Sequence, residues 1–479
     1  MKRTWKAPVC CLAVFVLYGF SASQVTFRQV AINSGDTSSY SITNGDINND
    51  GILDLVTVNA QSLSFYKGLG NGRYAAPVNQ PLGQYLGQAA AADFNRDGRL
   101  DLAIAEGCCS GSGDLIILLG NGNGTFRQGT NISVTGNNAV NIALADFNGD
   151  HLPDLAISSY LGNTDVFVGK GDGTFKRTAQ IQDGGLQAVA ADFNADGHQD
   201  LAMTGGGNVA LYLGNGDGTF ASSPLVANIN DVSFLAVGDF FNNRVPSIAV
   251  LTNLYDGAGD WETDMYMLRY SGGQLLVGNK IVIAPVTGDP FWQLVGGDLN
   301  GDFKDDLFLA GGDFQGSAVS GYMIGNGNGT FQGPFSAPTY MDLQNYPFIR
   351  DLNLDSRHDV GMAWTSIFDS IGGEEVLWNT SSAQNCGPPK ANPLNVHICA
   401  PMNGQTVGKT FTFRAAGNAF NGVAKRMELW IDGKKVGQNL EDQLRVKVPL
   451  PRGAHTASFV VVNTFDQYVS KSVTFTSSY

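Results

Sequence analysis

A ten-residue stretch that recurs along the chain constrains this sequence more than any other feature. Residues 93–102 read Asp-Phe-Asn-Arg-Asp-Gly-Arg-Leu-Asp-Leu, with acidic or amide oxygens at positions 1, 3, 5 and 9 and glycine at position 6. Such a loop can wrap one hard cation, because Ca²⁺ takes about six to eight oxygen ligands and glycine permits the sharp turn between them. The carbonyl of position 7 supplies a further oxygen, and the residues after the loop are typical of a buried strand.

The loop occurs repeatedly at a regular spacing. Intact copies begin at Asp46, Asp93, Asp146, Asp192, Asp298 and Asp351. In a seventh copy, which begins at Asp239, Phe241, Asn243 and Ser247 occupy ligand positions. One copy alone could be an ordinary turn, because Asp, Asn and Gly all favour turns. Successive copies start 46 to 59 residues apart, and repeats of this period predict a propeller or a solenoid.

The six intact loops predict up to six structural Ca²⁺ sites. Their ligands are the side chains at positions 1, 3, 5 and 9 and the carbonyl at position 7: Asp46, Asn48, Asp50, Ile52, Asp54, Asp93, Asn95, Asp97, Arg99, Asp101, Asp146, Asn148, Asp150, Leu152, Asp154, Asp192, Asn194, Asp196, His198, Asp200, Asp298, Asn300, Asp302, Lys304, Asp306, Asp351, Asn353, Asp355, Arg357 and Asp359. The formal net charge of −14 agrees with this interpretation, because the acidic residues concentrate in the loops. No block of Lys and Arg indicates a nucleic-acid or anionic-membrane partner.

The first 23 residues predict a secretory signal peptide. Lys2, Arg3 and Lys6 precede an apolar run over residues 7–20, and Ser21-Ala22-Ser23 supplies small residues before a cleavage point at Gln24. The run is too short for a mature membrane span, and no other stretch is long and apolar enough to form one. We therefore expect an exported protein that is extracellular, on the cell surface or periplasmic, without a membrane span.

Four cysteines follow this segment. Cys386 and Cys399 flank a Pro-rich linker and are candidates for a short disulfide, which an exported location permits. Cys108 and Cys109 are adjacent in a Gly- and Ser-rich loop, where they form either a vicinal disulfide or free thiols.

Each repeat predicts four antiparallel strands. In the second repeat, residues 89–93, 102–105 and 115–119 read as strands, and a glycine-rich turn at 120–126 leads into a fourth strand. The turn recurs at residues 169–175, 214–220 and 325–331 and, in shorter form, at 68–74. Four antiparallel strands make one propeller blade, so seven repeats predict seven blades.

The chain ends of the propeller are expected to close the ring. The last repeat has three strands, around residues 348–349, 360–364 and 376–378, and lacks the glycine turn and the fourth strand. Residues 25–30 resemble the strand that follows each glycine turn. We expect them to be the outer strand of blade seven, which also removes exposed sheet edges.

The loops, the Asp-Leu-Ala strands and the Leu-Gly-Asn-Gly-Asp-Gly-Thr-Phe turn at residues 213–220 resemble FG-GAP/VCBS-type repeats, which are similar to those of the integrin alpha-subunit propeller. This resemblance implies structural metal loops between the first and second strands of each blade. His151, Phe303 and Ser356 replace the loop glycine, and a left-handed non-glycine residue costs about 1–2 kcal/mol. We expect weaker binding in loops three, six and seven, and none in loop five.

The C-terminal part of the chain predicts a separate domain. After a propeller over residues 24–380 and a linker over 381–393, alternating strands are expected at residues 410–414, 426–431, 444–448, 456–462 and 472–476. Asp432-Gly433 and residues 451–453 read as hairpin turns. Residues 394–479 therefore resemble a bacterial immunoglobulin-like sandwich. The fold class is all-β, a seven-bladed β-propeller followed by this small sandwich.

The face opposite the metal loops carries the candidate ligand residues. Its predicted loops contain aromatic and acidic side chains, which suit sugar rings or protein partners. The candidates are Tyr255, Asp260, Trp261, Phe291, Trp292 and Tyr346. The alternative is that these aromatic side chains pack the long loops onto the propeller.

Three functions remain open from sequence. The leading hypothesis is a non-catalytic adhesion or recognition module for a surface glycan or protein. The second is a carbohydrate-active enzyme, either a polysaccharide lyase or a glycosidase, with Glu262 as one candidate carboxylate. Three of the five histidines lie inside the metal loops and two in the C-terminal domain, and none of the common hydrolase motifs is present, so we expect no catalytic residues. The third is a scaffold without a small ligand.

Overall fold

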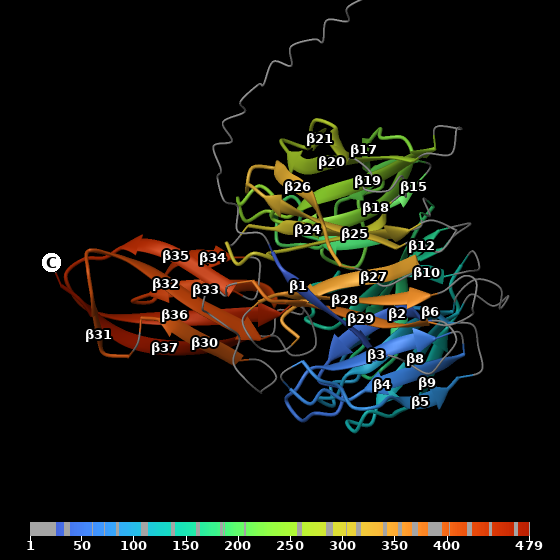
Figure 1. Ribbon diagram of the computed structural model, residues 1–479, viewed down its shortest axis with the longest axis horizontal. Helices are drawn as coiled ribbons and strands as arrows, with labels where there is room; N and C mark the ends of the chain where they lie inside the picture. The colour runs from blue at the N-terminus through green and yellow to red at the C-terminus, as the bar shows by residue number, and fades with distance from the viewer. Residues whose placement is uncertain are drawn as a thin grey trace, which may run out of the picture.

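The computed structural model is built from strands throughout the part of the chain that it describes (Figure 1). The described residues are 25–32, 39–59, 61–70, 72–82, 86–106, 114–135, 139–159, 163–182, 185, 187–205, 207–255, 261–283, 291–302, 304–312, 318–338, 343–352, 357–365, 372–381, 395–401, 403–418, 424–439, 443–463 and 468–478. Within these residues, no helix is long and apolar enough to cross a membrane.

Within the described residues, seven antiparallel sheets form the larger part of the molecule. We number these blades in chain order. Blades one to four contain β2 (Ser39–Gly45), β3 (Asp54–Asn59), β4 (Ser62–Tyr66) and β5 (Val78–Pro81); β6 (Leu86–Ala92), β7 (Asp101–Glu106), β8 (Leu115–Gly120) and β9 (Phe126–Ile132); β10 (Ala139–Ala145), β11 (Asp154–Ser159), β12 (Thr164–Gly169) and β13 (Phe175–Ile181); and β14 (Ala188–Ala191), β15 (Asp200–Gly205), β16 (Asn208–Tyr212) and β17 (Leu225–Ala227).

The remaining blades follow the same order with two variations. Blade five gains a fifth strand, and blade seven takes its outer strand from the N-terminal end. Blades five to seven contain β18 (Val232–Gly238), β19 (Ser247–Tyr255), β20 (Trp261–Ser271), β21 (Gln274–Val277) and β22 (Ile281–Ile283); β23 (Phe291–Gly297), β24 (Asp306–Gly312), β25 (Ala318–Gly325) and β26 (Phe331–Ser336); and β27 (Leu343–Arg350), β28 (Asp359–Thr365), β29 (Gly372–Asn379) and β1 (Phe27–Ile32).

The sheets are arranged as a propeller. The first strand of each blade packs against the first strand of the next, from β2 through β6, β10, β14, β18 and β23 to β27, and blade seven packs back against β2. Second and third strands are fully buried in several blades, as in β7 and β8, whereas the outer strand β9 is exposed or partly buried after its first residue, Phe126. Continuous apolar runs therefore form the middle strands, because both faces of each blade are covered by its neighbours.

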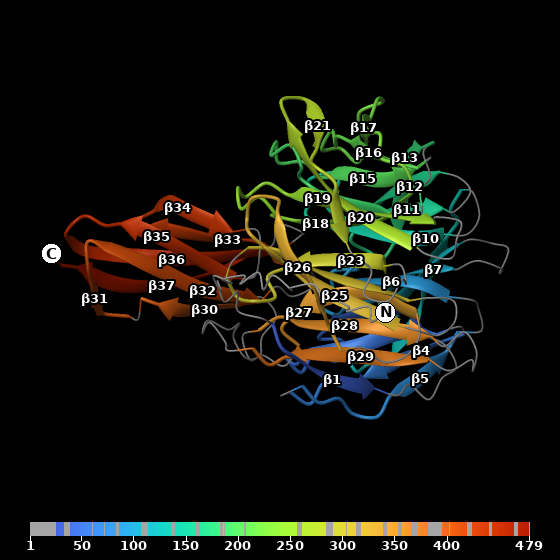
Figure 2. The ribbon, with the colours of Figure 1, turned by 45° about the horizontal axis from the view of Figure 1, so that its top comes forward.

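The predicted closure of the ring is confirmed. β1 pairs antiparallel with β29, with Phe27 opposite Asn379 and Ile32 opposite Glu374, and Figure 2 shows blue β1 beside orange β29. The Tyr322 hydroxyl of blade six donates to the Val25 carbonyl at 2.9 Å. The N-terminal strand therefore completes blade seven and joins it to blade six.

A row of polar side chains links the inner strands of blades one to five, and the sequence did not reveal it. It occurs five residues before the first Asp of a loop, next to a register shift in the inner strand. The amide of Gln88 accepts from the Ile142 N–H at 2.7 Å, and Asn141 accepts from the Ala188 N–H at 2.8 Å. Gln187 accepts from the Leu235 N–H and donates to its carbonyl. Each side chain thereby satisfies backbone groups of the following blade, which fixes the order and spacing of neighbouring inner strands.

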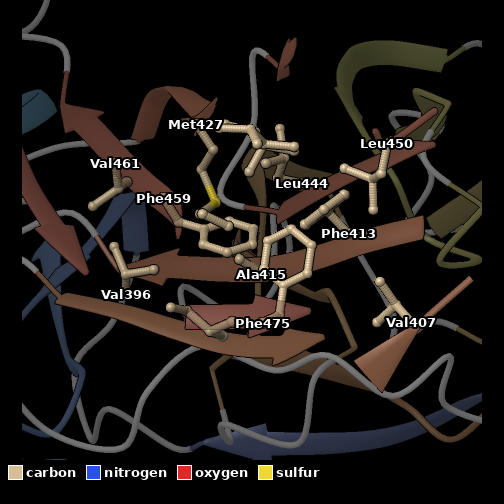
Figure 3. Packing of buried hydrophobic residues seen from close by; sticks show 14 residues of the cluster. Val396, Val407, Phe413, Ala415, Met427, Leu444, Leu450, Phe459, Val461 and Phe475 are labelled. Atoms are coloured by element: carbon tan, nitrogen blue, oxygen red, sulfur yellow. The ribbon is translucent and has the colours of Figure 1, made fainter. Parts of the chain in front are cut away.

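Two further sheets form a β-sandwich, which Figures 1 and 2 show to one side of the propeller. They contain β30 (Asn395–Ala400), β32 (Thr410–Asn418) and β35 (Gln443–Pro449); and β31 (Gln405–Val407), β37 (Tyr468–Ser477), β36 (Gly453–Asn463), β33 (Ala424–Ile431) and β34 (Lys434–Asn439). Figure 3 shows Phe413, Phe459 and Phe475 meeting in its core, with Phe413 and Phe475 at 5.4 Å between ring centroids.

The structure confirms one predicted turn of the sandwich and corrects the other. Asp432-Gly433, with φ of 50° and 79°, joins β33 to its partner β34 in a tight hairpin. Residues 451–453 do not form a hairpin, because β35 pairs with β32 whereas β36 pairs with β33 and β37. This connection crosses from one sheet to the other. The immunoglobulin-like assignment of the sandwich stays a prediction.

Candidate functional site

The second metal loop shows how its side chains are arranged. The carboxylate of Asp93 accepts from the N–H of Asp97 at 3.1 Å and from the N–H of Gly98 at 2.9 Å. Asn95 Oδ1 accepts from the Asp97 N–H at 2.9 Å, and Asp97 Oδ1 from the Arg99 N–H at 3.0 Å. The oxygens of positions 1, 3 and 5 are thus held over one turn by the N–H groups of the loop itself. Loops three and four repeat these bonds.

The carboxylate at position 9 of each loop was predicted as a metal ligand, but it also has a structural role. Asp101 is fully buried, and its two oxygens accept from the N–H of Phe94 at 2.9 Å and from the N–H of Gly120 at 2.8 Å. It therefore ties the metal loop to the start of the glycine turn. Equivalent buried carboxylates with the same pair of contacts are Asp54, Asp154, Asp200 and Asp306. Asp359 of blade seven, where the glycine turn is missing, accepts instead from the N–H groups of Leu352 and Asn379.

Burial changes the acidity of these carboxyl groups. It raises the pKa of Asp101 to about 7 against the lowering effect of its two N–H donors, and the nearby charges of Asp93 and Asp97 add to the increase. The pKa values of Asp54 and Asp154 are raised to about 7 for the same leading reason. Burial and the nearby charges of Asp93 and Asp97 thus both disfavour the ionised form of Asp101, and a bound cation would relieve this repulsion.

The first glycine of each glycine turn is required for this contact. A Cβ on Gly120 would lie 2.1 Å from the carbonyl oxygen of Leu100 in the metal loop, and one on Gly214 would lie 2.1 Å from that of Gln199. The recurrent glycine therefore marks a close approach of the turn to the loop within each blade. The sequence repeat revealed the glycine, but only the structure revealed its partner.

Neighbouring blades are joined by a second contact between these motifs. The loop residue Phe94 of blade two packs edge-to-face on Phe175 of blade three at 5.3 Å, and its carbonyl accepts from the Gly173 N–H at 3.0 Å. Phe147 with Phe220, and Phe240 with Phe331, repeat the ring contact at 5.6 and 5.8 Å. The loop and the turn therefore share one face of the propeller, as predicted, and join each blade to the next.

Weaker ion binding was expected in loop three because His151 replaces the loop glycine, but the backbone of the loop does not support that reason. His151 does adopt a left-handed conformation, with φ of 65°, but Gly149 occupies the other left-handed position of that loop. In loops one, two and four, these two positions carry one glycine and one non-glycine residue, so loop three is no more strained than they are. Loop five has non-glycine residues at both positions, Asn242 and Arg244. Phe303 and Ser356 of loops six and seven lie outside the described residues.

The oxygen set of the loops fits a hard cation in its chemistry. One Asp at position 1, an Asn at position 3, an Asp at position 5 and a carbonyl at position 7 are ligands that Ca²⁺ accepts. Three basic side chains pair with the position-5 carboxylates: Lys67 with Asp50, Arg99 with Asp97, and Lys304 with Asp302. Within the described part of the chain, no three His, Cys, Asp or Glu side chains gather as a metal cluster. A bound ion would therefore depend on the amide and carbonyl oxygens. Asn353 and Asp355 of loop seven lie outside that part of the chain.

The structure places two of the predicted ligand residues opposite one another and buries a third. Tyr255 and Trp261 are opposite one another at the end of the β19–β20 hairpin, whose strands of 9 and 11 residues exceed the six of β7 and β8. Phe291 is fully buried in the core between blades five and six, so its prediction as a ligand-facing residue is wrong. A buried position follows from the inner-strand role of β23, which the sequence did not reveal.

The remaining candidates are placed only in part. Trp292 is half-buried and its indole N–H donates to the Gly312 carbonyl at 2.8 Å, which agrees with a loop-packing role for at least part of the ring. Tyr346 lies in inner strand β27. Asp260 lies outside the described residues, as do Cys108, Cys109 and Cys386, whereas Cys399 lies in β30. The disulfide predictions therefore stay predictions.

Glu262, the candidate catalytic carboxylate, takes part in an ion-pair cluster. Lys280 Nζ lies 2.7 Å from Glu262 Oε1 and also pairs with the buried Asp264. These contacts raise the pKa of Lys280, which keeps it cationic. The cluster fixes β22 beside β20, so a structural role accounts for the charge of Glu262.

Comparisons with known proteins identify the repeat and show distant structural similarity. A model of the FG-GAP-like repeat matches residues 46–104, 93–157, 146–202 and 192–250. No curated protein sequence matches the chain. Among solved structures, a lectin from Agrocybe aegerita, described as recognising non-reducing terminal N-acetylglucosamine, aligns over 65% of this chain and 80% of its own, with 17% identity and a TM-score of 0.42.

Two other solved structures align over short segments. The fibronectin(III)-like modules of Clostridium thermocellum CbhA cover 18% of this chain and 100% of their own, with 20% identity and a TM-score of 0.17. The endo-beta-1,4-mannanase from Thermotoga petrophila covers 18% of this chain and 20% of its own, with 12% identity and a TM-score of 0.17. The matched repeats begin at the metal loops of blades one to four, so residues 46–250 of this propeller match the FG-GAP-like repeat.

Proposed function

We propose that the protein is an exported, calcium-binding β-propeller that recognises a surface glycan or protein without catalysis. The observation that carries this proposal is the division of the propeller between two faces. One face holds the repeated loops and glycine turns in dense hydrogen bonding. On the other, the β19–β20 hairpin extends and places Tyr255 opposite Trp261. Aromatic pairs on such a support suit sugar rings and protein anchors.

Calcium would act on the support and not on a reaction. The side chains of positions 1, 3 and 5 and the carbonyl of position 7 would hold the ion, and bound Ca²⁺ would neutralise the carboxylates that burial brings together. The chain's own part is to orient these oxygens through loop N–H groups and to connect the loop to the glycine turn through the carboxylate at position 9. Residues 1–23 would direct export.

Binding and turnover are tested in one assay. The purified mature protein is added in Ca²⁺ buffer to immobilised polysaccharides and matrix proteins, and both retained protein and released soluble product are measured. We expect retention on at least one surface without product, and at least a tenfold loss of retention in a Tyr255→Ala, Trp261→Ala double variant, because a hot-spot aromatic side chain contributes about 2 kcal/mol or more.

Tyr468→Ala is the control for retention, and Glu262→Gln is the control for turnover. Tyr468→Ala removes a side chain that is 70% exposed on the sandwich, and retention should be unchanged. Product release that is lost in Glu262→Gln would contradict the proposal and favour a carbohydrate-active enzyme. Absence of both retention and product would contradict it in favour of a scaffold.

A further inference from the structure

One end of the sandwich contains a histidine whose two ring nitrogens both face acceptors. His455 Nδ1 lies 2.6 Å from Asp432 Oδ2, and His455 Nε2 lies 2.9 Å from the Pro451 carbonyl oxygen. A neutral imidazole has one N–H and one lone pair, so it can donate to only one of these acceptors. The protonated ring donates to both.

The histidine joins three segments that are separate in the sequence. Asp432 belongs to the β33–β34 hairpin turn, Pro451 to the connection that crosses between the two sheets, and His455 to β36. The ring packs on Phe475 of β37, with 5.4 Å between centroids, and the His455 side chain is 6% exposed. Water therefore has little access to the ring to replace either acceptor.

We infer that protonated His455 is a pH-dependent clamp that fastens the sheet-crossing connection to the β33–β34 turn of the sandwich. Asp432 is the one charged group among the described residues that bonds to the ring, and Phe475 on the other side is apolar. Asp432 is itself fixed, because its Oδ1 accepts from the Thr456 N–H at 2.9 Å. The clamp depends only on these contacts and is independent of the function proposed above.

The sign of the pH effect follows from the neighbours. The hydrogen bond that His455 donates to Asp432 is the leading cause that raises the pKa of His455 above its ordinary 6.5, against a smaller lowering by burial. Burial tends to raise the pKa of Asp432, but the bonds from His455 and Thr456 lower it below its ordinary 3.8. The stabilisation is therefore present below pH 6.5 as long as Asp432 is ionised, and it is lost as the pH rises through the folded-state pKa of His455.

The clamp is tested by titrating the full chain with ¹³C-labelled histidine in NMR. His455→Gln identifies the signal among the five histidines. We expect a pKa above 6.5 in the parent protein and a lower value in Asp432→Asn, with the other histidine signals unchanged. Asn suits the left-handed conformation of residue 432, so this variant should keep the turn.

A second readout follows the backbone. The Thr456 amide should exchange with solvent faster above the His455 pKa than below it, after correction for base catalysis, and the additional increase should vanish in His455→Gln. A His455 pKa at or below 6.5, or a raised value that Asp432→Asn leaves unchanged, would overturn the clamp. A corrected Thr456 exchange rate that stays the same across the titration would also overturn the clamp.

Discussion

A chain that lacks residues 25–32 should fail to form a cooperatively folded propeller. The deletion removes the six-residue pairing of β1 with β29 and exposes the edge of blade seven. It also removes Phe27, whose ring meets Phe308 at 6.3 Å and Tyr322 at 5.7 Å in blade six. A domain is stable by only about 5–15 kcal/mol, and the loss of an entire paired strand is comparable with that reserve.

The deletion is measured by urea unfolding with tryptophan fluorescence and by size-exclusion chromatography. We expect no sharp unfolding transition and a shift to aggregates, because an unpaired edge templates association. Phe27→Ala is the matched point variant, and it should unfold cooperatively with a loss of about 2–4 kcal/mol. A deletion variant that stays monomeric with the parent midpoint would show that β1 does not close the ring.

The second large effect is expected at position 9 of a metal loop. Asp101→Ala leaves the N–H groups of Phe94 and Gly120 without their acceptor in a fully buried space. Each buried donor without a partner costs about 1–3 kcal/mol. We therefore expect a loss of about 2–6 kcal/mol in the free energy of unfolding, measured in urea with a chelator present so that no metal contributes.

Asp97→Ala in the same loop separates this structural role from metal binding. Asp97 is partly exposed, and it bonds to the N–H and side chain of Arg99. In chelator its loss should cost less than about 1 kcal/mol. In Ca²⁺ buffer Asp97→Ala should lose the stabilisation that the second loop gains from the ion. Equal losses for both variants in chelator would contradict the structural role of Asp101.

Most of the fold could be predicted from the repeated motifs in the sequence. Regular spacing of the Asp loops and glycine turns predicted the blades, and the missing fourth strand of the last repeat predicted the pairing of residues 25–30, because an open sheet edge needs a partner. The three-segment sandwich clamp and the polar row through Gln88 and Asn141 were not predictable in this way. They depend on side-chain contacts that neither the strand pattern nor the spacing of the loops indicates.

The candidate site shows the same limit. Asp101 looked like a fourth ligand because its spacing matched that of a metal loop, yet spacing does not reveal that its oxygens accept from Phe94 and Gly120. Phe291 looked exposed because it was expected in a loop on the open face, but its place at the start of an inner strand buries it. Residue type predicted the chemistry of each group, and the three-dimensional contacts determined its role.

Calcium titration of the chelator-treated protein would show whether the loops bind Ca²⁺ and whether the ions stabilise the propeller. Isothermal calorimetry would measure the number of ions, and a thermal melt of the same samples would measure their effect on stability. We expect several equivalents of Ca²⁺ per chain, up to six, and a higher melting temperature in Ca²⁺, because ions that bind only the folded state stabilise it by mass action. No heat of binding and no change in melting temperature between Ca²⁺ and chelator would contradict calcium binding by the loops.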